Sequence, residues 1–89
     1  MVSQLPKRIR WDYPEKVTVP ESFKRYLWEY QGEAPLEMLI LRVLTYGHFE
    51  EIRSVYRAYP EETFRLAFKY PKIKRGVRFW LKRWHTKKS

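Results

Sequence analysis

Cysteine is absent from this chain of 89 residues, and so is any long apolar segment. The lack of cysteine excludes disulfide bonds and thiolate metal sites, and it is compatible with a reducing compartment. A membrane-spanning helix needs about 18 or more consecutive apolar residues, and no segment comes near that length. The first ten residues include Lys7, Arg8 and Arg10, so they lack the apolar core of a secretory signal. We therefore expect a cytoplasmic protein with no membrane partner.

Acidic residues are absent after Glu62. Ten of the nineteen Lys and Arg residues lie beyond that point, between Arg65 and Lys88, whereas residues 1–64 contain nine basic and ten acidic residues. Nearly all of the formal charge of +9 therefore comes from the last 25 residues. A one-sided field of this kind attracts polyanions or an acidic protein surface. The charge pattern predicts a binding protein, and it leaves open whether the partner is a protein, RNA or DNA.

Asparagine is absent as well, and glutamine and methionine occur only twice each. Depletion of such heat-sensitive side chains, with Glu, Lys and Arg as the main polar residues, is typical of thermophilic proteins. The composition thus fits a thermophilic source, and chance in a chain of 89 residues can give the same bias.

Residue patterns typical of catalytic or metal sites are missing. The two histidines, His48 and His85, are far apart in the sequence, and neither has ligand-type neighbours at a metal-binding spacing. The four serines lie in no nucleophile motif, and the carboxylate pairs at 50–51 and 61–62 fall in expected first helical turns, where they stabilise the helix dipole. The three glycines are isolated, at positions where a helix cap or close packing would account for them: Gly32, Gly47 and Gly76. We expect no enzymatic activity, no cofactor and no metal.

The length and the sixteen aromatic residues predict one folded domain spanning residues 1–89. Residues 1–17 follow no helical or two-residue repeat and contain two prolines, so we expect an extended N-terminal arm that Trp11 anchors to the body. In the rest of the chain, apolar residues recur at spacings of three and four. The predicted fold is all-α, a compact bundle of four to five short helices, with residues 86–89 as a mobile tail.

Five helical segments are expected. A capping box of Thr18 and Glu21 would begin the first, and Gly32 would end it in a left-handed conformation. Pro35 opens the second, which is apolar nearly all round and runs to Gly47. The others span residues 48–59, 60–69 and 73–85, separated by prolines. The predicted core comprises Val43, Leu44, Ile52, Tyr56, Phe64, Phe68, Trp80 and Trp84.

The last helix has an apolar stripe and a basic side. Phe79 lies off the stripe, among cations, and it is either packed under the arm or the fourth helix, or exposed as an aromatic anchor for an unpaired base or a protein pocket. A membrane-surface helix would need the apolar stripe to be free, whereas a domain this small needs that stripe for its core. The candidate partner-binding residues are Arg75, Arg78, Phe79, Lys82 and Arg83.

Several short motifs occur in an informative order: Leu5-Pro6-Lys7-Arg8, Trp11-Asp12, Ile40 with Arg42-Val43-Leu44, Tyr46-Gly47, Glu50-Glu51 and Phe79-Trp80. This order resembles a family of small uncharacterised bacterial and archaeal proteins often encoded beside nucleotidyltransferase-fold toxins of the abortive-infection type. The resemblance implies an all-helical, antitoxin-like binding protein, not an enzyme. Such toxins bind nucleotides or tRNA acceptor ends, so the basic helix would either cover acidic catalytic residues or contact RNA. The segment 19–37 and the basic end depart from the family pattern and leave the partner open.

Overall fold

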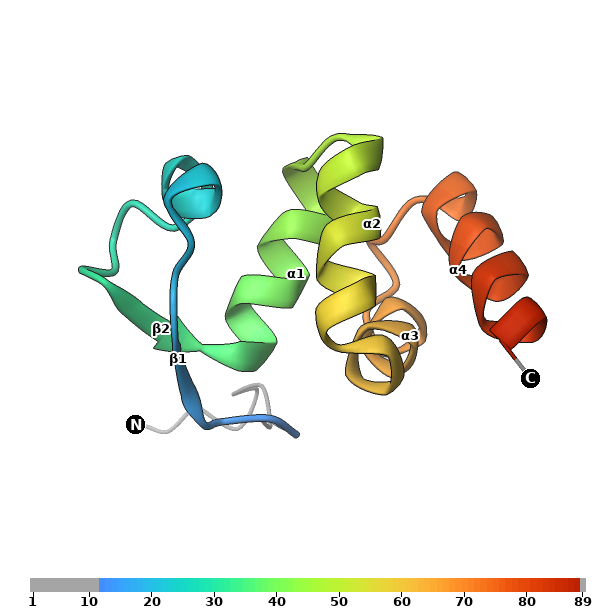
Figure 1. Cartoon of the computed structure of the whole chain (residues 1–89), viewed down its shortest axis with the longest axis horizontal. Coiled ribbons are helices and arrows are strands. Elements are labelled where there is room, and N and C mark those ends of the chain that lie inside the picture. The colour runs from blue at the N-terminus through green and yellow to red at the C-terminus, as the bar shows by residue number, and fades with distance from the viewer. Residues whose placement is uncertain (1–11, 89) are drawn as a thin grey trace, which may run out of the picture.

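Four α-helices, one 3₁₀ helix and two short strands form the part of the chain that the computed structural model describes, residues 12–88 (Figure 1). The side chains of residues 87 and 88 are not described. The predicted all-α class is confirmed, because the two strands contain only three residues each. In chain order the elements are β1 (Lys16–Thr18), η2 (Glu21–Tyr26), β2 (Glu33–Pro35), α1 (Leu36–Tyr46), α2 (Phe49–Ala58), α3 (Pro60–Lys69) and α4 (Arg75–Lys88).

A small hairpin lies at one end of the molecule and α4 at the other (Figure 1). β1 and β2 pair antiparallel with Val17 opposite Ala34. Gly32, at φ +90°, turns the chain into β2, and its carbonyl accepts the N–H of Val19 at 2.8 Å. This left-handed conformation favours glycine because a Cβ would be strained there.

The prediction of a helix that begins at Thr18 is wrong. Thr18 lies in β1, and the short 3₁₀ helix η2 begins only after Pro20, with no side-chain cap. Three β-branched residues, at positions 17–19, favour extended backbone, and pairing with β2 supplies hydrogen bonds that the capping box could not predict. Gly32 therefore belongs to a turn before a strand and does not end a helix.

The central helices agree closely with the sequence prediction. Pro60 occupies the first position of α3, and Gly47 follows α1. α1 is apolar on most sides because η2, β2, α2 and α3 all pack against it, whereas α3 contacts α1, α2 and α4. The helix α1 thus forms the centre of the core, and α3 connects it to α4.

The predicted core is correct for its central members. Val43, Leu44, Ile52 and Tyr56 are buried, and three predicted aromatic residues, Phe64, Trp80 and Trp84, are partly buried against them.

Phe68 is the exception, since 44% of its surface is exposed. The inward positions of α3 are Thr63, Leu66 and Ala67. One residue is about 100° of helix rotation, so a buried Ala67 turns Phe68 toward solvent. The hydroxyl of Thr63 donates to the carbonyl of Val55 at 3.3 Å, which satisfies this buried polar group.

The two ends of the described chain differ from each other in structure. Residues 1–11, including Trp11, lie outside the described part, and the segment from Asp12 onward is extended and leads into β1. At the other end α4 continues through Thr86 to Lys88, so these residues are helical where we expected a tail, and Ser89 lies outside the described residues. Within residues 12–88 no helix is long and apolar enough to cross a bilayer.

Candidate functional site

The apolar side of α4 fixes its orientation. Val77 and Leu81 are buried. Trp80 meets Phe49 of α2 edge to face, with ring centroids 4.6 Å apart, and Trp84 lies 5.5 Å from Tyr56. One side of α4 is held against α2 and α3 in this way, and α4 lies at one end of the molecule (Figure 1). The opposite side faces solvent, since Arg75, Lys82 and Arg83 are exposed.

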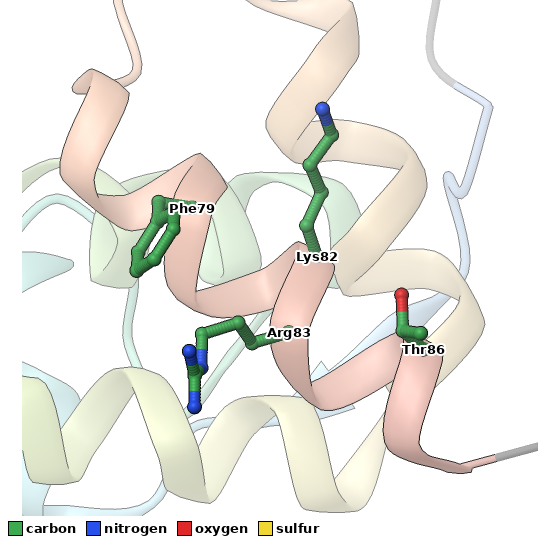
Figure 2. A pocket seen from close by; sticks show the side chains of 4 residues that line it. All are labelled: Phe79, Lys82, Arg83 and Thr86. Carbon is green, nitrogen blue, oxygen red and sulfur yellow. The ribbon is translucent and has the colours of Figure 1, made fainter.

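That exposed side contains most of the predicted site. We call it the α4 face and define it as Arg75, Gly76, Phe79, Lys82, Arg83 and Thr86, with Phe68 of α3 at its border. Phe79 is 56% exposed, and the guanidinium carbon of Arg83 lies 5.8 Å from its ring centroid. Figure 2 shows both side chains projecting to the same side of α4, whereas Lys82 points away from them. Phe79 is therefore exposed among cations and is not packed against α3, whereas residues 1–11 of the expected arm lie outside the described part.

Shallow, mostly apolar hollows lie along this face. One, of about 480 Å³, is lined by Phe79, Lys82, Arg83 and Thr86 (Figure 2). A second, of about 460 Å³, lies between Phe79 and Phe68 and also includes Gly76. A third, of about 610 Å³, continues over α3 toward Phe64 and Tyr13. Lys82 borders all three. The first two are lined by rings and cations without any carboxylate, whereas the third also includes Glu61.

Arg78 differs from the other predicted site residues. Its guanidinium donates from Nε to the carbonyl of Ala67 at 2.9 Å and from Nη2 to the carbonyl of Tyr70 at 2.8 Å. The last carbonyls of a helix lack partners within that helix, so Arg78 caps the C-terminal end of α3. Its guanidinium also lies over the ring of Phe68. The structure therefore gives Arg78 a structural role that the sequence did not predict, and Arg78 also lines the hollow between Phe68 and Phe79.

Several carboxylates of the described chain form ion pairs away from the α4 face. Arg42 binds Glu29 at 2.5 Å, and Arg25 binds Glu51 at 2.9 Å. The hydrogen bonds from Arg42 lower the pKa of Glu29. Among residues 12–88, no carboxylate lies within 4.0 Å of the cations of Arg75, Lys82 or Arg83. An acidic partner could thus bind these three cations without breaking an ion pair among the described residues.

His85 has a packing role near the end of α4. Its ring stacks on Phe64 with centroids 4.2 Å apart, and Nδ1 lies 2.9 Å from the hydroxyl oxygen of Tyr56. Nε2 lies 3.6 Å from a carboxylate oxygen of Glu61. Burial raises the pKa of Tyr56, and the nearby charge of Glu61 raises it further. These contacts fasten the last turns of α4 to α2 and α3.

The sequence prediction missed a buried polar cluster around Glu37. This carboxylate is fully buried. It accepts the backbone N–H groups of Asp12 at 2.6 Å and Tyr13 at 3.1 Å, the ammonium group of Lys69 at 2.5 Å and the hydroxyl of Tyr70. The signal available in the sequence was a single acidic side chain near the start of a helix that is otherwise apolar nearly all round.

The hydrogen bonds of this cluster determine its charge state. Burial by itself raises the pKa of Glu37, but the hydrogen bonds from Lys69, Tyr70 and the backbone outweigh burial and hold the pKa below its ordinary value. Burial and the bond to Glu37 raise the pKa of Tyr70 to about 12. Donors surround the carboxylate, so the cluster anchors the segment that enters β1 onto α1 and α3.

The described residues contain no group of three or more side chains that could hold a metal ion. No protein-family model matches the chain, and neither does any curated protein sequence or solved structure. The resemblance to toxin-associated helical proteins therefore stays a prediction from the motifs.

Proposed function

We propose that this protein is a non-enzymatic, antitoxin-like binding protein of the cytoplasm that holds an acidic protein partner on the α4 face. The observation that carries this proposal is the exposure of Phe79 in the middle of an acid-free helix, with apolar hollows on both sides. An aromatic side chain in such a setting is typical of the residues that contribute most to protein interfaces. The surrounding cations would speed association with an acidic surface and orient it.

The resemblance supplies the identity of the partner. It implies a nucleotidyltransferase-fold toxin, whose acidic catalytic residues would be covered by Arg75, Lys82 and Arg83. Since these cations have no carboxylate partner among the described residues, they are available for that purpose.

The test is co-purification with the product of the neighbouring gene. Phe79→Ala and Lys82→Glu should each weaken that complex by about tenfold or more, as expected for residues at the centre of an interface. Arg57→Glu removes an exposed cation of α2 outside the α4 face and serves as the matched control. A neighbouring toxin that ignores this protein in both a pull-down and a growth assay would end the proposal.

A second candidate function is binding of single-stranded nucleic acid. It is favoured by the aromatic rings and cations that line the two hollows beside Phe79, since such surfaces bind bases by stacking and phosphates by charge. Log affinity should then fall with log salt at a slope of about −0.7 to −0.9 per phosphate contact, and Lys82→Ala should flatten that slope by one contact. Titration of single-stranded RNA and duplex DNA at several salt concentrations measures this. Absence of binding at low salt would exclude this candidate.

A further inference from the structure

Gly76 has no structural reason to be glycine among the described residues. Gly32 has a positive φ, and a Cβ at Gly47 would lie 2.6 Å from the carbonyl oxygen of Val43. Neither condition applies to Gly76, where an added Cβ would meet no atom within 4 Å. Our expectation that close packing accounts for this residue is therefore wrong. Glycine is less favourable than alanine in a helix, so its presence in the first turn of α4 needs another explanation.

The surroundings of Gly76 suggest one. It lines the hollow between Phe68 and Phe79, with Arg75 and Lys82 at the edges. The missing side chain leaves the backbone of α4 open to close approach at this point, which is a common use of glycine at binding sites.

We propose that this hollow receives an apolar side chain from an acidic helix of the protein partner, and that the two helices come closest at Gly76. The inference rests on the proposed function and names the chemistry of its partner. Small side chains at a helix crossing shorten the distance between the axes, so a glycine marks the point of closest contact. Arg75 and Lys82 line the hollow and no carboxylate does, so acidic residues around the apolar side chain of the partner would complement its charge.

Base stacking on Phe79 would not explain the glycine. A base stacks on the face of Phe79, and a methyl group at position 76 would leave that ring in place. The absence of a Cβ therefore favours a partner that approaches the backbone of α4 itself.

The probe is a synthetic helical peptide with a leucine stripe flanked by glutamates, compared with a scrambled peptide of the same composition. Only three glycines occur in the chain, so their amide resonances are easily followed by ¹⁵N NMR. We expect the striped peptide to bind about tenfold more tightly than the scrambled one and to shift the Gly76 amide, with Gly32 and Gly47 as internal controls.

Substitutions separate the possible outcomes. Gly76→Leu should weaken peptide binding by about tenfold, whereas Ser54→Leu, the same side chain at an exposed position of α2, should leave it unchanged. Gly76→Ala should weaken binding while the melting temperature stays equal or rises, because alanine favours the helix.

Three results would overturn the inference. One result is that Gly76→Leu binds the peptide as tightly as the wild type whereas Phe79→Ala binds it more weakly. The partner would then contact the α4 face away from Gly76, and only the proposed role of Gly76 would be wrong. If neither substitution changes the affinity for the peptide, both the role of Gly76 and the proposed function are wrong. If the striped peptide does not bind and poly-uridine RNA does, the partner is a nucleic acid, and the proposal of an acidic helical partner is wrong.

Discussion

Replacement of Glu37 by glutamine should strongly destabilise the protein, because the carboxylate joins three parts of the fold. It accepts backbone N–H groups from Asp12 and Tyr13, the ammonium group of Lys69 and the hydroxyl of Tyr70, and it is fully buried. Glutamine keeps the size of the side chain but removes its charge and directs an NH₂ group toward one of these donors. Lys69 then loses its buried carboxylate partner.

The magnitude follows from the geometry. Removing one member of a buried ion pair costs roughly 3–5 kcal/mol. The Lys69 side chain is 25% exposed and also has the carboxylate of Asp12 at 3.2 Å, so we take the lower end, about 3 kcal/mol. At roughly 4–8 °C per kcal/mol for a domain of this size, the melting temperature should fall by about 12–24 °C. Urea unfolding followed by tryptophan fluorescence, together with thermal circular dichroism, measures both quantities.

Glu33→Gln is the matched control, because Glu33 is an exposed residue of β2. Its free energy of unfolding should change by no more than about 0.5 kcal/mol. If Glu37→Gln loses less than about 1 kcal/mol, the cluster does not anchor the segment entering β1, and the reasoning above is refuted.

The same cluster predicts a dependence on pH. The native pKa of Glu37 is lowered, so the unfolded chain binds its proton more readily than the folded chain. The stabilisation is then fully present above the unfolded pKa of about 4.3 and is lost as pH falls through the lower native pKa. The urea midpoint of the wild type should therefore fall more steeply below about pH 4.3 than that of Glu37→Gln, since only the wild type loses this contribution. Parallel profiles would contradict this assignment.

Three further substitutions have defined outcomes. Arg78→Met removes two hydrogen bonds to the end of α3 and should cost roughly 1.5–3 kcal/mol in urea unfolding, whereas Arg75→Met should have little effect; equal effects would exclude the capping role. Gly47→Ala places a methyl group 2.6 Å from the carbonyl oxygen of Val43 and should cost roughly 1–3 kcal/mol, so an unchanged melting temperature would contradict the close approach. Arg75→Glu exchanges a cation for an anion at the positive end of α4 and should add about 0.3–1 kcal/mol of stability, and a lower urea midpoint would oppose this reasoning.

The central helices could be predicted from the sequence because their signals are local. Pro35, Gly47 and Pro60 mark the ends of neighbouring helices, and the apolar spacing between them is helical. The same local reasoning failed near Thr18, where the hydrogen bonds come from β2, some fifteen residues further along the chain. A capping box describes only the residues beside it, so it cannot compete with a distant strand that the sequence does not reveal.

In the candidate site, too, the sequence predicted local features but not contacts between distant residues. The sequence placed Phe79 off the apolar stripe but left open whether it is packed or exposed, and the structure shows it exposed, with Arg75, Lys82 and Arg83 lining the same hollows. The role of Arg78 depends on carbonyls eight and eleven residues away, at the end of α3. The Glu37 cluster joins segments separated by 24 to 33 residues. A sequence pattern shows that a buried charge needs partners, but only the folded chain shows which groups they are.

The α4 face combines several features that oppose the stability of its own helix. Arg75 lies in the first turn, where the helix dipole favours anions. Arg78 and Lys82 are like charges four residues apart, an arrangement unfavourable by roughly 0.2–0.5 kcal/mol. Gly76 is less favourable than alanine by up to about 1 kcal/mol, and Phe79 leaves much of its ring in water. Folding requires none of these choices except the capping contact of Arg78, since the apolar stripe of α4 already supplies its packing. Several residues that lower helix stability lie together on one exposed face, as is typical of functional surfaces. Binding of a partner accounts for these residues, whereas folding does not.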